Sequence, residues 1–410
     1  MRIAEVLYKL KKPWHFLKTG LARGLVSQIR YGFPARKLTI ITVTGTDGKT
    51  TTAFLVYHLL KTAGIKVALV STVGAFIGEE QIDTGFHVTS PQPDELHAFM
   101  ARLRKEGYTH LVLETTSQGI YQYRTWGIYP TIAGLTNITN NEHLDYHITY
   151  ENYLTSKVDI LKKAKTAVIN ESDESYPKVK KLLKNSQAKV VTFSIANPLP
   201  NKVPSAIRER FSEPYNQLNA RLAATICEEL GIEAGDVITG LATFPSIIGR
   251  KQTIMAPQEF KVIIDFAHTP NALVSLLSQL RTELVQSRTG GKLIAIYGCA
   301  GLRDTTKRPI MGQIGAELAD TVVFTAEDPR TENVWTIIRQ MKEGIEHDHS
   351  KVVSVADRKE AIAFGLQHLA GKGDIVAVLG KGHEKSICYG KVEYPWSDYQ
   401  AVKDALGIKE

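Results

Sequence analysis

Apolar and polar residues alternate along the chain with two periods, one typical of buried strands and the other of helices. Short β-branched runs such as LTIITVT (38–44) and HLVLET (110–115) have the composition of strands buried on both faces of a parallel sheet. Between them the apolar spacing becomes helical, as in DELHAFMARLRKEG (94–107). This alternation predicts an α/β domain over residues 38–247 with a mostly parallel, doubly wound sheet. Its other predicted strands are KVALVST (66–72), TIAGLT (131–136) and TAVIN (166–170).

A second alternating run follows the turn-rich sequence PSIIGR (245–250). Apolar runs of strand length again alternate with helical spacing, which predicts a smaller, Rossmann-like α/β domain over residues 248–410. The strands predicted in this domain are 260–267, 292–298, 320–326, 351–356 and 374–380.

The N-terminal segment carries the whole net charge of +8: residues 1–38 hold nine Lys or Arg and one acid, whereas the rest holds 41 of each. A neutral body argues against a nucleic-acid enzyme with a basic channel. Because the segment is also rich in Leu, Trp and Phe, residues 1–37 are predicted to form a basic amphipathic arm, as one helix or a helix pair broken near Pro13. Two interpretations remain open: contact with an anionic membrane surface, or packing on the body with the basic face solvated.

Composition limits the class of protein further. Apolar residues make up 43% and charged residues 22% of the chain, as in ordinary soluble proteins. The three cysteines lie far apart without a C-x-x-C pair, which fits a reducing compartment and neither a disulfide framework nor a zinc cluster. No apolar run approaches the roughly 18–20 residues that span a bilayer, and no secretory signal is visible. We expect a cytoplasmic protein, with peripheral contact at the inner membrane face as the alternative.

The sequence TGTDGKTTT (44–52) joins the first predicted strand to a helix. Gly45 and Gly48 let backbone N–H groups approach phosphate oxygens, and the helix N-terminus favours anions. Lys49 can reach the β- and γ-phosphates, and Thr50 offers a hydroxyl to Mg²⁺. The loop therefore predicts nucleotide binding. The alternative, an ordinary glycine-rich turn, is disfavoured because Gly-Lys-Thr-Thr lies where the phosphate mechanism requires it.

Two later stretches add candidate metal ligands. Glu114 ends a parallel strand and is well placed to hold Mg²⁺, directly or through water, although it could also be a solvated or helix-capping acid. His143 and His147 follow in TNITNNEHLDYHITYENYLTSK (136–157), but the segment looks like a loop and has no third soft ligand nearby, which disfavours zinc. On residue type alone Lys157 would be a surface lysine.

In this order, GTDGKTTT, ETTSQG, TNITNNEHLDYH and YLTSK resemble the Mur ligase family, ATP-dependent enzymes that join amino acids to cell-wall precursors. Motifs in the second half are similar to those of the family's tripeptide synthetases, which add meso-diaminopimelate or lysine. The resemblance covers about residues 38–410. The second-half motifs are PYNQLNARLAA (214–224), GRKQ (249–252), DFAHTP (265–270), GCAGLRDTTKRPIMG (298–312), AEDPRTE (326–332) and GKGHE (380–384).

The resemblance implies a reaction in which ATP phosphorylates the terminal carboxylate of a muramoyl-L-Ala-D-Glu peptide. The amine of an amino acid attacks the resulting acyl phosphate, and an amide forms through a tetrahedral intermediate. A carboxylate is a poor electrophile, so phosphorylation supplies a leaving group, and catalysis then rests on positioning and charge neutralisation. Two Mg²⁺ ions and a monomeric enzyme with no nucleic-acid partner are expected. A folylpolyglutamate synthetase-like enzyme is the alternative.

The resemblance also implies roles for individual residues. The ATP-binding residues would be Gly45, Thr46, Asp47, Gly48, Lys49, Thr50, Thr51, Asn219, Arg250, Asp265 and His268. The residues serving metal would be Thr50, Glu114, His143 and Lys157, the last as a carbamate, and Lys49 would join Glu114, His143 and Lys157 in catalysis. The residues touching the muramoyl-peptide acceptor would be Thr89, Ser90, Ser117 and Arg124. Those holding the incoming amino acid would be Arg303, Glu327, Asp328, Arg330, Gly380 and Glu384.

Arg330 bears on which amino acid is used. In the family, D-N-P-R accompanies diaminopimelate, whose distal carboxylate suits a guanidinium. Here the stretch reads Glu327-Asp328-Pro329-Arg330, so the arginine is present, although acids occupy the two leading positions. Because the arginine is present, meso-diaminopimelate is favoured over lysine.

The chain departs from the family pattern in several places. The larger departure is that the tripeptide synthetases normally begin with a domain that grips uridine diphosphate, whereas only the basic arm precedes residue 38. This leaves open whether the acceptor is UDP-linked or lipid-linked. The smaller departures, which leave the charged chemistry intact, are Asp47 for asparagine, Gln118 for histidine, and Ala300 and Leu302 in the G-C-G-G-D-R-D-like stretch.

Overall fold

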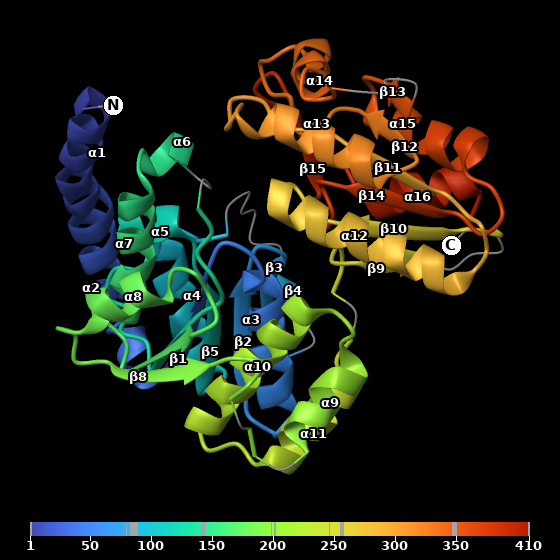
Figure 1. Ribbon diagram of the computed structural model, residues 1–410. Coiled ribbons are helices and arrows are strands. Elements are labelled where there is room, and N and C mark those ends of the chain that lie inside the picture. The colour runs from blue at the N-terminus through green and yellow to red at the C-terminus, as the bar shows by residue number, and fades with distance from the viewer. Residues whose placement is uncertain are drawn as a thin grey trace. The chain divides into compact units, whose positions relative to one another are not determined.

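The chain forms two compact units, Met1–Pro245 and Ser246–Glu410 (Figure 1). The division falls inside the PSIIGR sequence, close to the boundary expected between residues 247 and 248. The computed structural model describes residues 2–78, 80–82, 89–140, 144–197, 199–200, 202–245, 247–254, 258–346 and 351–408.

The first unit is built on a sheet that has eight strands within the described residues, in the order β4-β3-β2-β5-β1-β6-β7-β8. All neighbours from β2 to β8 pair in parallel, and β3 and β4 add an antiparallel edge. The five strands predicted in this domain are confirmed; β3, β4 and the edge strand β8 were not predicted. The strands are β1 (Thr39–Thr44), β2 (Val67–Ser71), β3 (Gly74–Ile77), β4 (Glu80–Ile82), β5 (His110–Glu114), β6 (Ile132–Leu135), β7 (Thr166–Asn170) and β8 (Lys189–Phe193).

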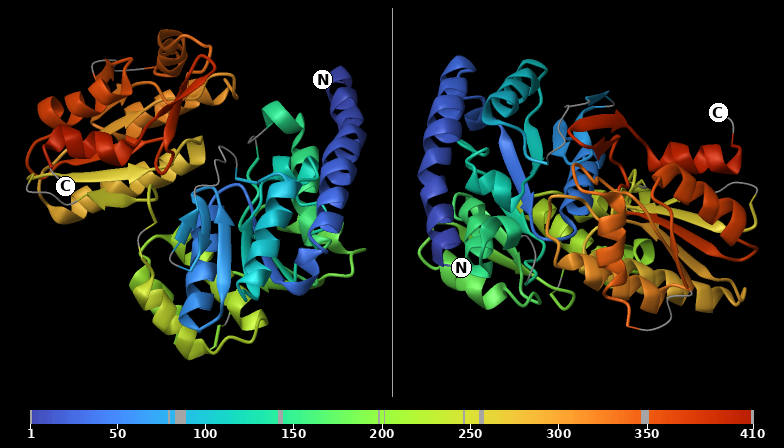
Figure 2. Two further views of the ribbon diagram at one scale, coloured as in Figure 1. Left: turned by 180° about the vertical axis from the view of Figure 1, so that it is seen from behind. Right: turned by 90° about the horizontal axis from the view of Figure 1, so that it is seen from above.

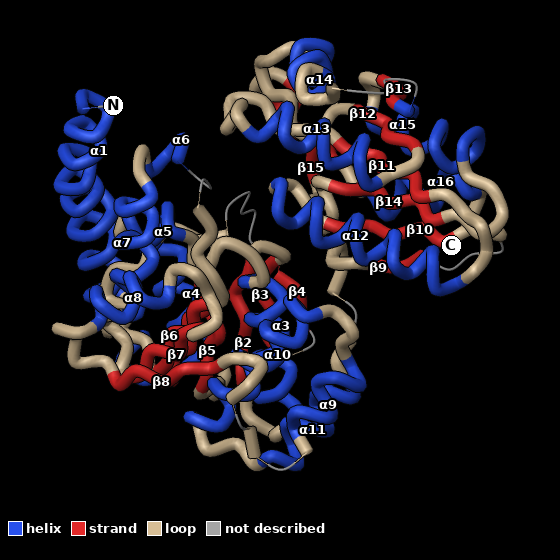
Figure 3. The backbone as a smooth tube through the Cα atoms, in the orientation of Figure 1, coloured by secondary structure: helices blue, strands red, loops and turns tan. Residues whose placement is uncertain are grey.

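Helices cover both faces of this sheet, as a doubly wound fold requires. Alternate strand residues form one core with α4 and another with α7, whereas α3 and α10 pack together on the opposite face (Figure 3). The helices are α3 (Lys49–Thr62), α4 (Pro93–Lys105), α5 (Ser117–Tyr121), α6 (Leu144–His147), α7 (Tyr150–Leu161), α8 (Tyr176–Leu183), α9 (Val203–Arg210), α10 (Pro214–Glu229) and α11 (Ala234–Thr243).

The register of the central strands gathers the predicted site. Strand β1 lies between β5 and β6, with Val43 opposite Glu114 and Thr44 opposite Leu135. Because parallel strands end at the same edge of a sheet, the loop after β1, the end of β5 and the residues after β6 meet there.

The second unit has a six-stranded sheet within the described residues, in the order β13-β12-β11-β14-β10-β9, of which only β9 pairs antiparallel. Helices α12, α13 and α14 pack on one face, and α15, η4 and α16 on the other. The predicted strands are confirmed; β9 and a separate hairpin, β15–β16, were not predicted. The elements are β9 (Gln252–Ile254), β10 (Lys261–Asp265), α12 (Pro270–Ser287), β11 (Leu293–Tyr297), α13 (Lys307–Leu318), β12 (Thr321–Phe324), α14 (Val334–Lys342), β13 (Val352–Ser354), α15 (Arg358–Phe364), η4 (Gly365–Leu369), β14 (Ile375–Leu379), β15 (Ser386–Tyr389), β16 (Val392–Pro395) and α16 (Asp398–Leu406).

The N-terminal arm lies along the first unit, beside α5 and α7 (Figures 1 and 2). Of the two expected forms of the arm, the helix pair broken near Pro13 is wrong: α1 (Arg2–His15) runs through this proline, continues as the π-helix η1 (Phe16–Leu25), and passes into α2 (Val26–Arg30). The short η2 (Pro34–Lys37) follows. A π-helical stretch is a known way to absorb local disruption of the hydrogen-bond ladder. No helix in the described ranges has the length and apolarity needed to cross a membrane.

The arm packs on the body in an unexpected orientation. Its buried side consists largely of small or polar residues, including Thr19, Gly20, Gly24 and Ser27, together with the ring of Tyr8. Most of the large apolar side chains point to solvent instead. The exposed apolar residues are Val6, Leu7, Leu10, Trp14, Leu17, Leu25, Val26 and Ile29. Packing on the body is therefore observed, but it leaves an apolar face solvated as well as a basic one.

Candidate active site

The loop between β1 and α3 needs both of its glycines. Gly48, directly before α3, has a left-handed φ of 77°, and a Cβ atom there would lie 2.2 Å from the Asn219 Oδ1 atom. A Cβ on Gly45 would lie 1.7 Å from the Thr136 Oγ1 atom. The loop backbone is thus held tightly against α10 and the residues after β6, at the N-terminus of a helix, where anions are favoured.

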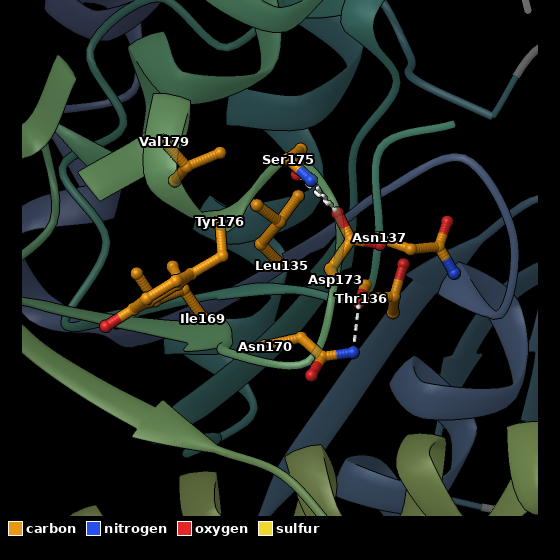
Figure 4. A pocket seen from close by; sticks show the side chains of 9 residues that line it. All are labelled: Leu135, Thr136, Asn137, Ile169, Asn170, Asp173, Ser175, Tyr176 and Val179. Carbon is orange, nitrogen blue, oxygen red and sulfur yellow. Dashed lines mark hydrogen bonds between the residues drawn. The ribbon is translucent and has the colours of Figure 1, made fainter. Parts of the chain in front are cut away.

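Residues after β6 fix the shape of this loop. The Asn137 Oδ1 atom accepts hydrogen bonds from the backbone N–H groups of Thr46 (3.2 Å) and Asp47 (2.9 Å). The Thr136 hydroxyl donates to the Asp47 carbonyl (2.6 Å), and the Asn170 amide donates to the Thr136 carbonyl (3.4 Å; Figure 4). The hollow drawn in Figure 4 is too narrow to admit water, so it is not a ligand site. Its lining residues Thr136 and Asn137 support the loop. Asn137 was missed from sequence, although it lies in a quoted motif.

The predicted metal ligands Thr50 and Glu114 lie together. The Thr50 hydroxyl donates to Glu114 Oε1 at 3.0 Å, and the Glu114 side chain is buried. Thr72, which sequence reasoning missed, donates to Glu114 through its backbone N–H and its hydroxyl, both at 3.0 Å, and its hydroxyl also lies 2.9 Å from that of Thr89. A buried carboxylate with neighbouring hydroxyls is an oxygen donor set of the kind that Mg²⁺ prefers.

Two lysines converge on the loop from different helices. Lys49, at the start of α3, donates to the Thr46 carbonyl at 2.7 Å, and Thr51 lies in the same helical turn. Lys157, on α7, is 1% exposed, donates to the Gly45 carbonyl and lies 4.7 Å from the Tyr153 ring centroid. The surface position that residue type alone suggested for Lys157 is therefore wrong. Burial, aided by the charge of Lys49, lowers the pKa of Lys157 well below its usual value.

The structure describes only one of the two histidines in residues 136–157. His143 lies outside the described residues, so its assignment to a metal stays a prediction. His147 is fully buried: its Nδ1 atom lies 2.8 Å from the Tyr8 hydroxyl, and its Nε2 atom lies 3.0 Å from Ser117 Oγ. Burial and the charge of Lys157 lower its pKa to about 3.

The residues predicted to touch an acceptor form a connected group. Arg124 donates to the Ser90 carbonyl at 2.8 Å, and Ser90 Oγ lies 3.3 Å from the Thr116 hydroxyl, one residue before Ser117. Thr89 joins this group to Glu114 through Thr72. The predicted acceptor residues and the predicted metal ligands Thr50 and Glu114 thus share one edge of the sheet.

In the second unit, the predicted nucleotide-binding residues cluster just before β9 and around the end of β10. Asp265 accepts from the backbone N–H groups of Lys251 (2.6 Å) and Ala267 (2.8 Å), and burial raises its pKa. The Arg250 guanidinium lies 4.7 Å from the Phe266 ring centroid, and His268 Nδ1 lies 2.9 Å from the Phe266 carbonyl. Arg250, Asp265 and His268 are therefore neighbours, as predicted.

The predicted amino-acid site lies at the ends of β12 and β14. Lys381, which sequence reasoning assigned no role, is 1% exposed and pairs with Asp328 (2.7 Å) and Glu384 (2.5 Å). Burial raises the pKa of Glu384 to about 7, although Lys381 opposes this. Glu327 is buried with a raised pKa, and a Cβ on Gly380, whose φ is 102°, would contact its side chain at 3.6 Å.

Arg330 completes this cluster, whereas Arg303 is exposed. The Arg330 backbone is left-handed, with φ of 51°, and its Nη1 group donates to the Gly301 carbonyl at 2.7 Å. Its Nη2 atom lies 3.7 Å from Asp328. About a quarter of its side chain is exposed, so the guanidinium is held at the surface of the cluster.

The sequence matches family profiles across both units. The profile of the Mur ligase middle domain covers residues 43–219, and that of the Mur ligase, glutamate ligase domain covers residues 249–382. A UDP-N-acetylmuramoyl-L-alanyl-D-glutamate--2,6-diaminopimelate ligase of Clostridium botulinum is 34% identical over 93% of this chain and 78% of its own. The chain belongs to the Mur ligase family. A ligase of the same name from Bacteroides fragilis is 34% identical over 94% of this chain and 82% of its own.

Solved structures of Mur ligases and their relatives share the fold. A 2,6-diaminopimelate ligase superposes with a TM-score of 0.59 at 28% identity, covering 94% of this chain and 82% of its own. Folylpolyglutamate synthase of Mycobacterium tuberculosis, solved with ADP and AMPPCP, superposes with a TM-score of 0.68 over 92% of this chain and 96% of its own, at 18% identity. The second likeness concerns the fold alone.

Proposed function

We propose that this Mur ligase is an ATP-dependent enzyme that joins meso-diaminopimelate to the D-glutamate carboxylate of a muramoyl-L-Ala-D-Glu peptide. The observation that carries the proposal is the arrangement at one sheet edge of the phosphate-type loop, the Thr50–Glu114 pair and the buried Lys157. The names of the relatives supply the substrates.

The reaction follows from the poor electrophilicity of a carboxylate. The acceptor carboxylate attacks the γ-phosphorus of ATP, which releases ADP and forms an acyl phosphate. The amine then attacks the acyl carbon, and the tetrahedral intermediate expels inorganic phosphate to leave an amide, with the amine proton passing to solvent. Loop N–H groups and Lys49 would neutralise charge on the transferring phosphoryl group.

Thr50 and Glu114 are the residues that we assign to one Mg²⁺, which when bound neutralises triphosphate charge. We assign a second ion to His143 and to Lys157 as its carbamate. An uncharged lysine amine adds CO₂ and loses a proton to give this anion, so the depressed pKa of Lys157 supports the assignment because it favours the reactive neutral amine.

For the amino acid, we propose that Arg330 binds the distal carboxylate of diaminopimelate and that the acids around Lys381 bind ammonium groups. A guanidinium fork matches a carboxylate in two parallel hydrogen bonds, whereas the distal ammonium of lysine would be repelled. The remaining predicted contacts, Asn219 and Arg303 among them, keep the roles that the family resemblance implies.

The direct experiment measures ADP and phosphate release with Mg²⁺ and ATP while the other components are omitted one at a time. We expect release to require UDP-N-acetylmuramoyl-L-Ala-D-Glu, and the tripeptide to form with meso-diaminopimelate and not with lysine. If the enzyme uses a lipid-linked muropeptide and not the UDP-linked one, the acceptor would be reassigned to the lipid-linked form. Turnover with a folate and glutamate instead would overturn the proposal in favour of a folylpolyglutamate synthetase-like enzyme.

We further propose that the arm binds an anionic membrane surface and that the enzyme acts as a cytoplasmic monomer. The arm combines exposed apolar residues, among them Leu10 and Trp14, with many basic residues, a composition typical of interfacial helices. Trp14→Glu should abolish sedimentation with phosphatidylglycerol vesicles. Val285→Glu, at an exposed apolar position in the second unit, should not. Equal sedimentation of both variants would refute the membrane contact.

A further inference from the structure

One aromatic residue of the N-terminal arm reaches the predicted acceptor site. Tyr8 is 7% exposed, whereas most neighbouring apolar residues of α1 face solvent. Its ring stacks on that of Tyr121, with centroids 4.3 Å apart, and its backbone carbonyl accepts the Tyr121 hydroxyl. Its own hydroxyl lies between two polar groups of the body, 2.8 Å from His147 Nδ1 and 3.2 Å from Ser156 Oγ.

The direction of these hydrogen bonds can be worked out from the number of protons. The Ser156 hydroxyl donates its single proton to the Asn152 carbonyl at 2.8 Å, so Ser156 can only accept from Tyr8. For both contacts of the Tyr8 hydroxyl to be hydrogen bonds, its single proton goes to Ser156 and its oxygen accepts at the 2.8 Å contact with His147. His147 therefore carries a proton on Nδ1.

The direction of the hydrogen bond at the other ring nitrogen, Nε2, follows from the same reasoning. His147 is fully buried, and burial disfavours the charged imidazolium, so the ring is neutral. A neutral imidazole with a proton on Nδ1 has only a lone pair on Nε2. The Ser117 hydroxyl, 3.0 Å from Nε2, must then donate to it.

We propose that Tyr8 is a positioning residue that acts through His147 and orients Ser117 as a hydrogen-bond acceptor for an N–H group of the acceptor substrate. With its proton held by His147, Ser117 Oγ offers only lone pairs to a ligand, which suits a peptide N–H and not a carboxylate. The arm thus forms part of the acceptor site. This inference rests on the proposed function, because it takes Ser117 to be an acceptor contact.

The first test needs no substrate. In protein labelled with ¹⁵N-histidine, the ring nitrogen shifts and couplings of His147, assigned with His147→Gln, should report the Nδ1–H tautomer. In Tyr8→Phe the Nδ1 proton loses its acceptor, and the ring should convert to the Nε2–H tautomer. An Nε2–H tautomer in the wild type, or no change in Tyr8→Phe, would overturn the relay whatever the protein catalyses.

The second test uses the full-length enzyme and its muramoyl-peptide acceptor. Tyr8→Phe should raise KM for the acceptor about fivefold, the equivalent of one hydrogen bond of about 1 kcal/mol, with little change in KM for ATP. Tyr121→Phe is the matched control, because it also removes a hydroxyl that joins arm and body but lies outside the relay. In a Ser117→Ala background, Tyr8→Phe should add nothing.

The outcomes separate the two proposals. Equal effects of Tyr8→Phe and Tyr121→Phe, or additivity with Ser117→Ala, would reduce Tyr8 to an anchor of the arm and overturn the inference. The Nδ1–H tautomer without turnover of any muramoyl acceptor would refute the proposed function, and with it the acceptor role of Ser117, while leaving the hydrogen-bond directions intact.

Discussion

Arg358 is a fully buried residue whose removal should strongly destabilise the second unit. Its side chain is 0% exposed, and two of its nitrogens donate to the two carboxylate oxygens of Asp398, each at 2.8 Å. It also donates to the carbonyls of Ala326 (3.1 Å) and Leu379 (2.8 Å). These carbonyls lie where the loops after β12 and β14 begin, so the pair also holds the predicted amino-acid site.

Arg358→Met keeps most of the volume but leaves the Asp398 carboxylate buried without its cation. Removing one member of a buried ion pair costs about 3–5 kcal/mol. We take about 3 kcal/mol, because the Trp396 indole N–H still donates to Asp398 at 2.8 Å. For a unit of this size each kcal/mol shifts Tm by about 2–4 °C, so Tm should fall by roughly 6–12 °C.

The assay is thermal and urea unfolding, followed by circular dichroism, of the wild type and two variants. Lys359→Met is the matched control in the same helix: its ion pair with Asp404 is 3.4 Å long, and both side chains are largely exposed. Exposed pairs contribute about 0–1 kcal/mol. A loss in Arg358→Met no larger than that in Lys359→Met would refute the argument from burial.

Three further predictions concern the proposed chemistry. Lys157→Met should lower turnover by at least about 10- to 100-fold, yet raise the free energy of unfolding at pH 7 in CO₂-free buffer. The folded-state pKa of Lys157 lies below its unfolded value of about 10.4, so burying this lysine destabilises the wild type at every pH below that value. The stability gained by Lys157→Met should therefore vanish above this pH. A variant less stable than the wild type at pH 7 would contradict this. KM for the amino acid should rise as pH falls through about 7, because the Glu384 carboxyl then becomes protonated, and Glu384→Gln should flatten this profile; an unchanged profile would exclude Glu384 as the titrating group. Arg330→Met should cut the kcat/KM preference for meso-diaminopimelate over lysine by about 10- to 100-fold, as for one charge-assisted hydrogen bond, and an unchanged ratio would remove Arg330 from the specificity site.

The parallel strands could be predicted because a strand that is buried on both faces consists of a short apolar run, as in residues 38–44. The edge strands β8 and β16 are largely exposed, so no run of buried apolar residues marks them in the sequence. The phosphate-type loop and the Thr50–Glu114 pair were predictable because parallel strands end at one edge of a sheet.

The orientation of the arm could not be predicted from amphipathicity. Its close approach to the body depends on glycines: a Cβ on Gly24 would lie 2.5 Å from the Trp126 ring. Most of the large apolar side chains of the arm face outward, the reverse of the usual rule for a surface helix. Contacts such as that between Tyr8 and His147 join residues 139 positions apart and have no local signature. The burial of Lys157 likewise could not be predicted from its residue type, because lysines usually lie at the surface. Only the family resemblance suggested a role for it in the site.

The central claim is that ATP activates the acceptor carboxylate, and oxygen transfer tests it most directly. UDP-N-acetylmuramoyl-L-Ala-D-Glu labelled with ¹⁸O in the terminal carboxylate is incubated with ATP, Mg²⁺ and meso-diaminopimelate, and the released phosphate is analysed by mass spectrometry. The account predicts one ¹⁸O atom in the inorganic phosphate for each amide formed, because the acyl phosphate passes its bridging oxygen to phosphate. Amide formation with unlabelled phosphate would contradict the acyl-phosphate mechanism.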